Sequence, residues 1–283
     1  MLFSVNLLFL AATCFISGYA YECGIPQANV WLSGKDSYDN RMIIEGRVAK
    51  WHELPWVVFI DFLKNGFVRH SCSGSIISPK HVLTALHCLT HNGSLIPHSL
   101  KNSKYAIKVK VGSRYKNEGL TFNRKTYYVF AFENGFADFA VLRLDEEIKF
   151  RHLDAAPICL SKLRPEDGET LIVAGHGIHL NRKNVTRPER SYVIGNATVL
   201  KNGPWKLDHY QFYTGDLNGG GAAGDSGCPA MTIFNGKYYQ VGILIQGNHQ
   251  KVDGGIFNHG VYNAISPFCD GIKEVTHGMA YCQ

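Results

Sequence analysis

Hydrophobic residues along the chain occur in many short runs, and glycine, asparagine or aspartate follows most of them. Short apolar runs with such breaks are typical of strands in a β-sandwich or β-barrel. No long amphipathic helical pattern occurs before the last fifteen residues. The pattern therefore predicts an all-β fold, with its clearest strands at residues 56–60, 75–77, 82–86, 139–144, 171–174 and 241–245.

The amino-terminal segment has a different pattern. Residues 1–20, MLFSVNLLFLAATCFISGYA, carry no charge, and their apolar run is short for a membrane span. Small residues stand at Gly18 and Ala20, where a signal peptidase would cleave. We therefore expect residues 1–20 to be a signal peptide and the protein to be secreted, with no membrane span. Residues 21–42 are polar and without periodicity, and we interpret them as a leader.

Length and composition fit two modest domains or one large β or α/β unit. The chain has 283 residues, of which 45% are hydrophobic and 18% charged, with a net charge of +6. We expect no nucleic-acid partner. Basic residues gather between Lys101 and Lys125, where Glu118 is the only acid. We interpret this zone as a solvated strand face, and contact with an anionic glycan or an acidic protein is the alternative.

The cysteines suit an oxidising compartment. Without Cys14 of the signal peptide seven remain, so at least one has no partner within the chain. Cys72 and Cys88 bracket a predicted strand–turn–strand, and a disulfide between them would fix the backbone there. No Cys/His spacing of a zinc site occurs, and no metal is expected. Three glycosylation sequons begin at Asn92, Asn184 and Asn196.

Three motifs hold residues suited to nucleophilic catalysis. His87 ends an apolar run in TALHC, Asp138 stands in ADFAVL, and Ser226 lies in GGGAAGDSGCPA. Taken singly, the histidine would be a packing or surface residue and the aspartate a strand cap. A carboxylate beside so apolar a strand is costly unless it is paired, however, and glycines around a serine allow amide groups to point inward. No Gly-Lys-Ser/Thr follows the glycines, which excludes a nucleotide-binding loop. The three motifs together indicate a nucleophile, its base and an orienting acid.

These motifs resemble those of the chymotrypsin-like, trypsin-fold serine proteases over residues 43 to about 275. Residues 43–46 (IIEG) resemble the family's activated amino terminus, and residues 260–262 (GVY) the strand behind its specificity pocket. Residues 174–177 (AGHG) are similar to the family's small-Gly-Trp-Gly turn, with His176 replacing the tryptophan. The resemblance implies a domain at 43–283 with two six-stranded antiparallel β-barrels, a C-terminal helix, and an active site in the cleft between the barrels.

The resemblance implies a role for each residue of the catalytic motifs. His87 would take the hydroxyl proton of Ser226 as that oxygen attacks a peptide carbonyl. Asp138 would orient His87 and stabilise its imidazolium form. The backbone N–H groups of Gly224 and Ser226 would form the oxyanion hole.

Zymogen activation follows from the same resemblance. The new amine of Ile43 would form an ion pair with Asp225 and order the site. A disulfide between Cys23 and Cys159 would keep the leader attached. Met42 precedes Ile43, whereas trypsin-like activators cut after arginine or lysine. We hypothesise activation after Met42 by an enzyme that prefers apolar residues, or trimming after a first cut. An apolar specificity of the chain itself would permit self-activation.

The specificity pocket departs from the trypsin pattern. Gly220 stands where trypsins carry an aspartate at the base of the pocket. The other glycines expected to line the pocket are Gly221, Gly247 and Gly260. An open, uncharged pocket suits large apolar side chains rather than arginine or lysine.

Two further departures concern the substrate strand and a disulfide. Ile245 and Gln246 replace the family's serine and tryptophan, so Asp138 loses one hydrogen-bond partner. Ala222 replaces the first cysteine of the disulfide that holds the nucleophile loop, and its partner is also missing. A bridge between Cys269 and Cys282 requires that the C-terminal segment is not one continuous helix. The pairing of three cysteines stays open: Cys228, Cys269 and Cys282.

We therefore expect a secreted serine endopeptidase, made as a zymogen, that cuts after apolar residues. Its expected partners are protein or peptide substrates and protein protease inhibitors. No cofactor is expected, because the loop at Ser113 lacks the acidic ligands of a calcium site. The alternative is a catalytically weak or inactive homologue that acts as a binding or regulatory module. The intact triad motifs favour the enzyme, whereas Met42, Ile245 and Gln246 favour the alternative.

Overall fold

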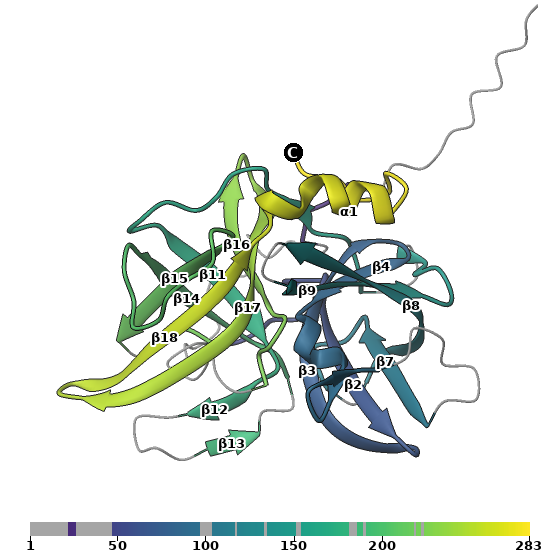
Figure 1. Ribbon diagram of the computed structural model, residues 1–283, viewed down its shortest axis with the longest axis horizontal. Coiled ribbons are helices and arrows are strands. Elements are labelled where there is room, and N and C mark those ends of the chain that lie inside the picture. Colours follow the sequence, from purple (N-terminus) through teal and green to yellow (C-terminus); the bar gives the residue numbers. More distant parts are fainter. Residues whose placement is uncertain are drawn as a thin grey trace, which may run out of the picture.

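The computed structural model describes residues 22–26, 47–96, 104–116, 118–132, 135–150, 154–180, 186–188, 191–217, 219–221 and 224–283. The predictions about the signal peptide, Met42, Ile43, Asn184 and Ala222 fall outside these residues. Figure 1 shows two β-barrels side by side, with the carboxyl-terminal helix across their upper edge. The predicted all-β fold with two six-stranded barrels and a C-terminal helix is confirmed.

The first barrel is closed by pairing between its first and fourth strands in chain order. Its order around the barrel is β2-β3-β4-β9-β8-β7, and the pairs are antiparallel. Buried and more exposed residues alternate along β7, as expected when one face of a strand points into a core. The strands are β2 (Val57–Lys64), β3 (Phe67–Ser78), β4 (His81–Thr84), β7 (Tyr105–Val111), β8 (Leu120–Phe132) and β9 (Gly135–Leu144).

The second barrel is a ring in which β14 pairs with both β11 and β15. Its order is β14-β11-β16-β17-β18-β15, again with antiparallel pairs. The strands are β11 (Thr170–Gly175), β14 (Val193–Leu200), β15 (Gln211–Leu217), β16 (Pro229–Phe234), β17 (Lys237–Val252) and β18 (Gly255–Ala264).

Shorter elements complete the described chain. β1 (Arg47–Val48) pairs with β14, and β10 (Cys159–Leu160) pairs in parallel with β17. Two small hairpins are formed by β5 (Thr90–His91) with β6 (Ser94–Leu95), and by β12 (Ile178–Leu180) with β13 (Thr186–Pro188). The helical elements are two 3₁₀ turns, Leu86–Leu89 and Ser266–Phe268, and the α-helix α1 (Cys269–Val275). No helix of the described residues is long and apolar enough to cross a membrane.

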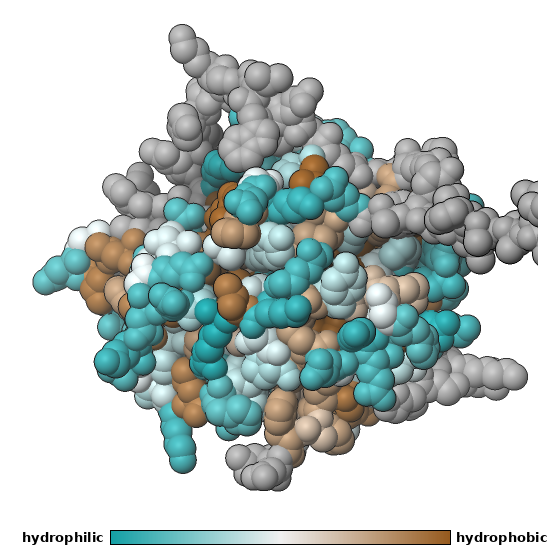
Figure 2. Space-filling model, turned by 90° about the horizontal axis from the view of Figure 1, so that it is seen from above, coloured by the Kyte–Doolittle hydropathy of each residue, from teal (hydrophilic) through white to brown (hydrophobic). Residues whose placement is uncertain are grey.

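Contacts between the barrels hold the two halves in a fixed relation. The indole N–H of Trp56 donates to Met231 Sδ at 3.2 Å, and the hydroxyl of Ser75 donates to Gln240 Oε1 at 2.6 Å. The segment around α1 packs on the first barrel, where the ring of Phe268 stacks on Phe139 at 3.9 Å between centroids. Figure 2 views the face that carries this helix, where apolar side chains form small separate groups among polar ones.

The C-terminal segment turns back on itself. The helix α1 ends at Val275, and the hydroxyl of Thr276 donates to Ile272 O at 2.8 Å. Gly278 then adopts a φ of 75°, a backbone conformation in which glycine carries no steric penalty. Because the segment reverses here, Cys282 reaches Cys269, and the two form a disulfide. The sequence allowed this bridge only if the helix stops before Cys282, and the helix does stop, at Val275.

Candidate active site

The end of β4 positions His87. The sequence predicts a strand through residue 86, but β4 ends at Thr84 and a 3₁₀ turn covers Leu86–Leu89. This turn directs His87 away from the strand. Cys88 is bonded to Cys72 on β3, which holds the turn to the barrel. A ring nitrogen of His87 lies within 4.8 Å of both sulfur atoms, and these sulfurs are bonded to each other, so the group offers no thiolate to a metal.

Asp138, on β9, binds His87 twice. Its Oδ1 accepts the backbone N–H of His87 at 2.8 Å, and its Oδ2 lies 2.7 Å from the ring Nδ1. An ionised carboxylate can only accept, so the Nδ1 carries the hydrogen and Nε2 stays free to act as a base. The functional interpretation assumed a buried acid, but the Asp138 side chain is 29% exposed and that of His87 41%.

Asn263 links the two barrels at this point. Its amide Nδ2, on β18, donates to the backbone carbonyl of Asp138 at 2.8 Å. The side chain of Asn263 is fully buried, and Gln211 Nε2 donates to its Oδ1 at 3.2 Å. The sequence pattern does not single out Asn263, because this bond depends on the packing of two barrels whose residues are distant in sequence. Ile245 is half-buried and packs against the core, as an apolar residue should.

The nucleophile loop lies directly on the first barrel. The carbonyl oxygen of Ser226 accepts the N–H of Ser73 at 2.9 Å and lies 3.9 Å from Cys88 Sγ. Gly227 has a φ of 80°, and a Cβ there would clash with Thr84 and Ser73, so the close approach requires glycine. Among the described residues, no hydrogen bond joins the Ser226 hydroxyl to His87 Nε2. The structure thus brings the three motifs together and forms the His87–Asp138 pair.

The amides expected to form the oxyanion hole belong to Gly224 and Ser226. Both residues are half-buried. In the described part of the chain, neither N–H donates a hydrogen bond to a backbone or side-chain acceptor. The two amides are therefore available to an oxyanion, and their role stays a prediction.

Asp225 is 1% exposed and lies against the turn at residues 174–177. Its Oδ1 accepts the N–H of Gly177 at 2.6 Å, and a Cβ on Gly177 would meet the carboxylate. Its expected partner, Ile43, lies outside the described residues. The ion pair between the Ile43 amine and Asp225 therefore stays a prediction. The burial of Asp225 is consistent with it, because a buried carboxylate is costly unless its charge is paired.

His176, in the same turn, is 3% exposed. Its ring lies between those of Phe59 and Tyr192, with centroids 5.2 and 5.5 Å away. Neither ring nitrogen has a hydrogen-bond partner among the described residues. Burial first, and then the charges of Lys116 and Lys110, lower the pKa of His176 to about 3. The ring is therefore neutral at physiological pH.

The cysteines of the described chain form three disulfides and one free thiol. Cys23 is bonded to Cys159, and Cys228 is free and buried. Burial, followed by the negative charge of Asp225, raises the pKa of the Cys228 thiol well above its ordinary value. A thiol in this state is unreactive, so its position two residues after Ser226 does not make it a second nucleophile.

The glycines of the expected pocket converge around a residue that sequence analysis missed. Gly247 and Gly260 are paired across β17 and β18. A Cβ on Gly247 would lie 3.2 Å from the carbonyl oxygen of Gly221, and that oxygen accepts the Nδ2 of Asn258 at 2.6 Å. A Cβ on Gly220 would lie 2.9 Å from the same Nδ2. Asn258 is two residues before Gly260 on the same strand face, which is the signal that would have found it.

Asp216 is an acid on the strand beside Asn258, and the sequence did not single it out. It pairs with Asn258 in the β15–β18 register. Both of its carboxylate oxygens accept hydrogen bonds from Thr198, one from the backbone N–H and one from the hydroxyl at 2.9 Å. Because Thr198 engages both oxygens, the carboxylate is directed to β14.

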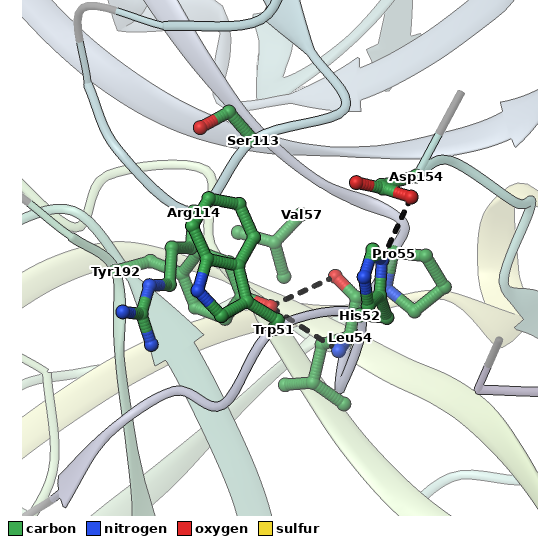
Figure 3. Close-up of a pocket in the computed structure, with 9 residues that line it drawn as sticks. All are labelled: Trp51, His52, Leu54, Pro55, Val57, Ser113, Arg114, Asp154 and Tyr192. Carbon is green, nitrogen blue, oxygen red and sulfur yellow. Dashed lines mark hydrogen bonds and ion pairs between the residues drawn. The ribbon is translucent and has the colours of Figure 1, made fainter. Parts of the chain in front are cut away.

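The basic zone between Lys101 and Lys125 is not the single solvated face that the sequence suggests. The Nζ of Lys110 lies 2.9 Å from Asp61 Oδ2, and Arg124 is 3% exposed. Figure 3 shows Arg114 beside a small hollow, where its guanidinium carbon lies 4.7 Å from the centre of the Trp51 ring. The members of the zone thus face different ways, since some serve the packing of the first barrel.

Two of the glycosylation sequons fall on described residues. Asn92 is exposed at the turn between β5 and β6, and Asn196 is exposed on β14. Both side chains are open to solvent, and their modification stays a prediction.

The chain belongs to the trypsin family. The sequence model of that family, described as Trypsin, matches residues 43–272. The match therefore covers both barrels, the three motifs of His87, Asp138 and Ser226, and the helix up to Ile272.

The relatives are serine proteases at low identity. The chain is 29% identical to chymotrypsin-C of Bos taurus over 160 residues, 56% of this chain and 53% of that protein. It is 27% identical to coagulation factor IX of Oryctolagus cuniculus over 271 residues, 90% and 94% of the two chains. It is 26% identical to the CLIP domain-containing serine protease B4 of Anopheles gambiae, over 82% of this chain and 69% of that one. The chain thus spans about half the length of the chymotrypsin-C relative.

Proposed function

We propose that the protein is a secreted serine endopeptidase that cuts polypeptides after apolar residues. The observation that carries this proposal is the pair of hydrogen bonds from His87 to Asp138, beside the loop of Ser226. Membership of the trypsin family supports it. The identities of 26–29% to its relatives are too low to transfer a substrate.

The proposed reaction assigns each of these residues a step. His87 Nε2 takes the proton of the Ser226 hydroxyl while the serine oxygen forms a bond to the substrate carbonyl carbon. The resulting oxyanion accepts the N–H groups of Gly224 and Ser226. His87 then gives its proton to the leaving amine as the C–N bond breaks, and water removes the acyl group by the same steps in reverse. Asp138 holds the ring in the required tautomer throughout.

Secretion and activation are part of the proposal. Residues 1–20 are the signal peptide, and residues 21–42 are a leader that the Cys23–Cys159 disulfide keeps attached after a cut before Ile43. The buried carboxylate of Asp225 receives the new amine of Ile43. Three disulfides in the described chain support an oxidising compartment.

A fluorophosphonate probe tests the activity without a known substrate. The protein is processed to begin at Ile43, and the probe is expected to label it at one residue. The matched Ser226→Ala variant should take no label, while its disulfides and thermal unfolding stay the same. Processed protein without Ser226-dependent labelling would instead be a binding module on the same fold. One observation favours this alternative. Gly247 lies so close to Gly221 that a Cβ on Gly247 would be 3.2 Å from the Gly221 carbonyl oxygen, which leaves little room for a substrate side chain between them.

The preference for apolar residues rests on the residues expected to line the specificity pocket. Its described members are four glycines and Asn258, without a charge, and Thr198 engages the nearby Asp216. We expect kcat/KM to be higher after Phe, Leu or Met than after Arg, measured with peptides that differ only at that residue. Faster cleavage after Arg, lost in Asp216→Asn, would mean that Asp216 reaches the pocket and would reverse the proposed preference.

A further inference from the structure

Four basic side chains gather at one end of the first barrel, beside the turn that carries His87. Lys64 ends β2, Arg69 lies on β3, His91 lies on β5, and Lys104 stands just before β7. We call these four residues the basic cluster. The Nζ of Lys64 lies 2.8 Å from Nε2 of His91. Because an ammonium only donates hydrogen bonds, Nε2 of His91 accepts and its ring is neutral beside Lys64.

The basic cluster has no ion-pair partner in the described part of the chain. None of the ion pairs there involves a lysine, arginine or histidine of the cluster. Asp61, the acid on β2, is engaged by Ser71 Oγ at 2.7 Å and by Lys110 Nζ at 2.9 Å. The pKa of His91 is lowered, first by burial and then by the positive charges of Lys64, Arg69, His70 and Lys104. The charges therefore act on one another, and a bound anion would relieve their repulsion.

The local fold brings the cluster together. β3 carries one more residue than β2 opposite residues 62–63, so Arg69 is the extra residue of a bulge. A bulge re-aims a side chain out of the regular alternation of a strand. The ring of Tyr105 lies below the two ammonium groups, with its centre 5.9 Å from the Nζ of Lys64 and 5.5 Å from that of Lys104. An aromatic face is a favourable support for such cations.

The basic cluster lies on the side of the site to which the leaving group departs. The N–H of Ser73 on β3 donates to Ser226 O at 2.9 Å, and β3 leads from there to Arg69. The expected pocket, which would hold the side chain before the cleaved bond, is formed with β17 and β18 of the second barrel. His87, which would protonate the leaving amine, belongs to the first barrel. Four residues of β3 span roughly 13 Å, which is the reach of about four extended substrate residues.

We propose that the basic cluster binds acidic side chains of a polypeptide substrate, at about the third or fourth residue after the cleaved bond. The proposal rests on the proposed protease function and adds a preference for acidic substrates. The tip of the same hairpin exposes Phe67 by 69% and Val68 by 53%. A polypeptide can use these apolar contacts, whereas a sulfated glycan has no apolar side chains, so the surface favours a polypeptide.

Peptides that differ in charge test the proposal on the processed enzyme. The set keeps one residue before the cleaved bond and carries Glu-Glu, Gln-Gln or Lys-Lys at the third and fourth positions after it. We expect kcat/KM to be about threefold to tenfold higher for Glu-Glu than for Gln-Gln, and lowest for Lys-Lys, because several weak exposed ion pairs add up. The difference should shrink as salt is added. Equal values for the Glu-Glu and Gln-Gln peptides would overturn the proposal.

Charge-neutral variants test the cluster itself. The triple variant Lys64→Gln/Arg69→Gln/Lys104→Gln should bring the ratio of kcat/KM between the Glu-Glu and Gln-Gln peptides close to one. Arg69→Gln alone, at an exposed position, should lower this ratio in part. The matched control loses the same net charge at exposed lysines elsewhere, with Lys162→Gln/Lys206→Gln/Lys273→Gln, and should keep the ratio. An unchanged ratio in the cluster variant would contradict the proposal.

Binding separates this proposal from the proposed function. The same peptides, carrying a fluorophore, are titrated against Ser226→Ala and followed by anisotropy. Tighter binding of the Glu-Glu peptide, in a chain whose processed form hydrolyses no peptide, would support the acidic site and remove the protease activity. Equal affinities would overturn the acidic site, whatever the activity. Binding of dextran sulfate that the triple variant loses, together with equal affinities for the peptides, would assign the cluster to a glycan and overturn the proposal as well.

Discussion

Replacing Asp138 with asparagine is expected to lower the kcat of the processed enzyme by about 10⁴-fold. The carboxylate accepts two bonds from one residue, the backbone N–H and the Nδ1–H of His87. Asparagine offers one oxygen and one NH₂ group, so it cannot accept both. If its NH₂ faces the ring, it requires Nδ1 to accept, and the hydrogen moves to Nε2. His87 could then no longer take the proton of Ser226.

The Asp138→Asn variant should fold normally, so a fall in kcat can be attributed to the catalytic step and not to unfolding. The side chain of Asp138 is only partly buried, and the bond from Asn263 to the Asp138 backbone carbonyl stays in place. We therefore expect a small loss of stability. Asp145→Asn, at the exposed residue that follows the same strand, is the matched control and should keep its kcat. Both are assayed on one peptide substrate, with thermal unfolding alongside. Retention of more than about a tenth of kcat in the Asp138 variant would show that His87 does not depend on this acid.

The three candidate motifs can be recognised in the sequence because each is a short contiguous stretch. TALHC, ADFAVL and GDSG each place one reactive residue at the end or the start of an apolar run, and the structure brings these three places together. The tautomer of His87 is less local, since it depends on the carboxylate of Asp138 from a strand 51 residues away. The 3₁₀ turn that presents His87 was not foreseen, because apolar residues continue past Thr84 where the strand itself ends.

The features that sequence analysis missed depend on long-range register. Asn258 meets Gly221 only because β18 pairs with β17 beyond Gly247. No periodicity along one strand reports where its neighbour ends. The disulfide between Cys269 and Cys282 forms because the chain reverses at Gly278. The helical pattern before Gly278 is too short to be stable alone, so it does not extend the helix to Cys282.

Acid should destabilise the protein through His176, and His176→Phe should remove that part of the effect. The folded pKa of about 3 lies below the ordinary value of 6.5, so the unfolded chain binds a proton first as the pH falls. Above pH 6.5 the ring is neutral in both states and there is no contribution. Between 6.5 and about 3 the free energy of unfolding should fall by about 1.4 kcal/mol per pH unit. His81, whose pKa is lowered to about 4 by burial and by Arg143, acts in the same direction.

The slope with pH is a better measure of this effect than stability at one pH. At neutral pH phenylalanine removes two buried nitrogens without partners, a gain of about 1–3 kcal/mol, but its larger ring costs about 1–3 kcal/mol in a packed site. These terms offset each other, whereas the proton linkage remains. Urea unfolding in the Ser226→Ala background, which avoids self-cleavage, should show a shallower fall from pH 6.5 to 4 in His176→Phe. His249→Phe, at an exposed position, should keep the original slope. Equal slopes in all three proteins would mean that the buried ring of His176 finds a way to accept its proton without unfolding the turn that holds Asp225.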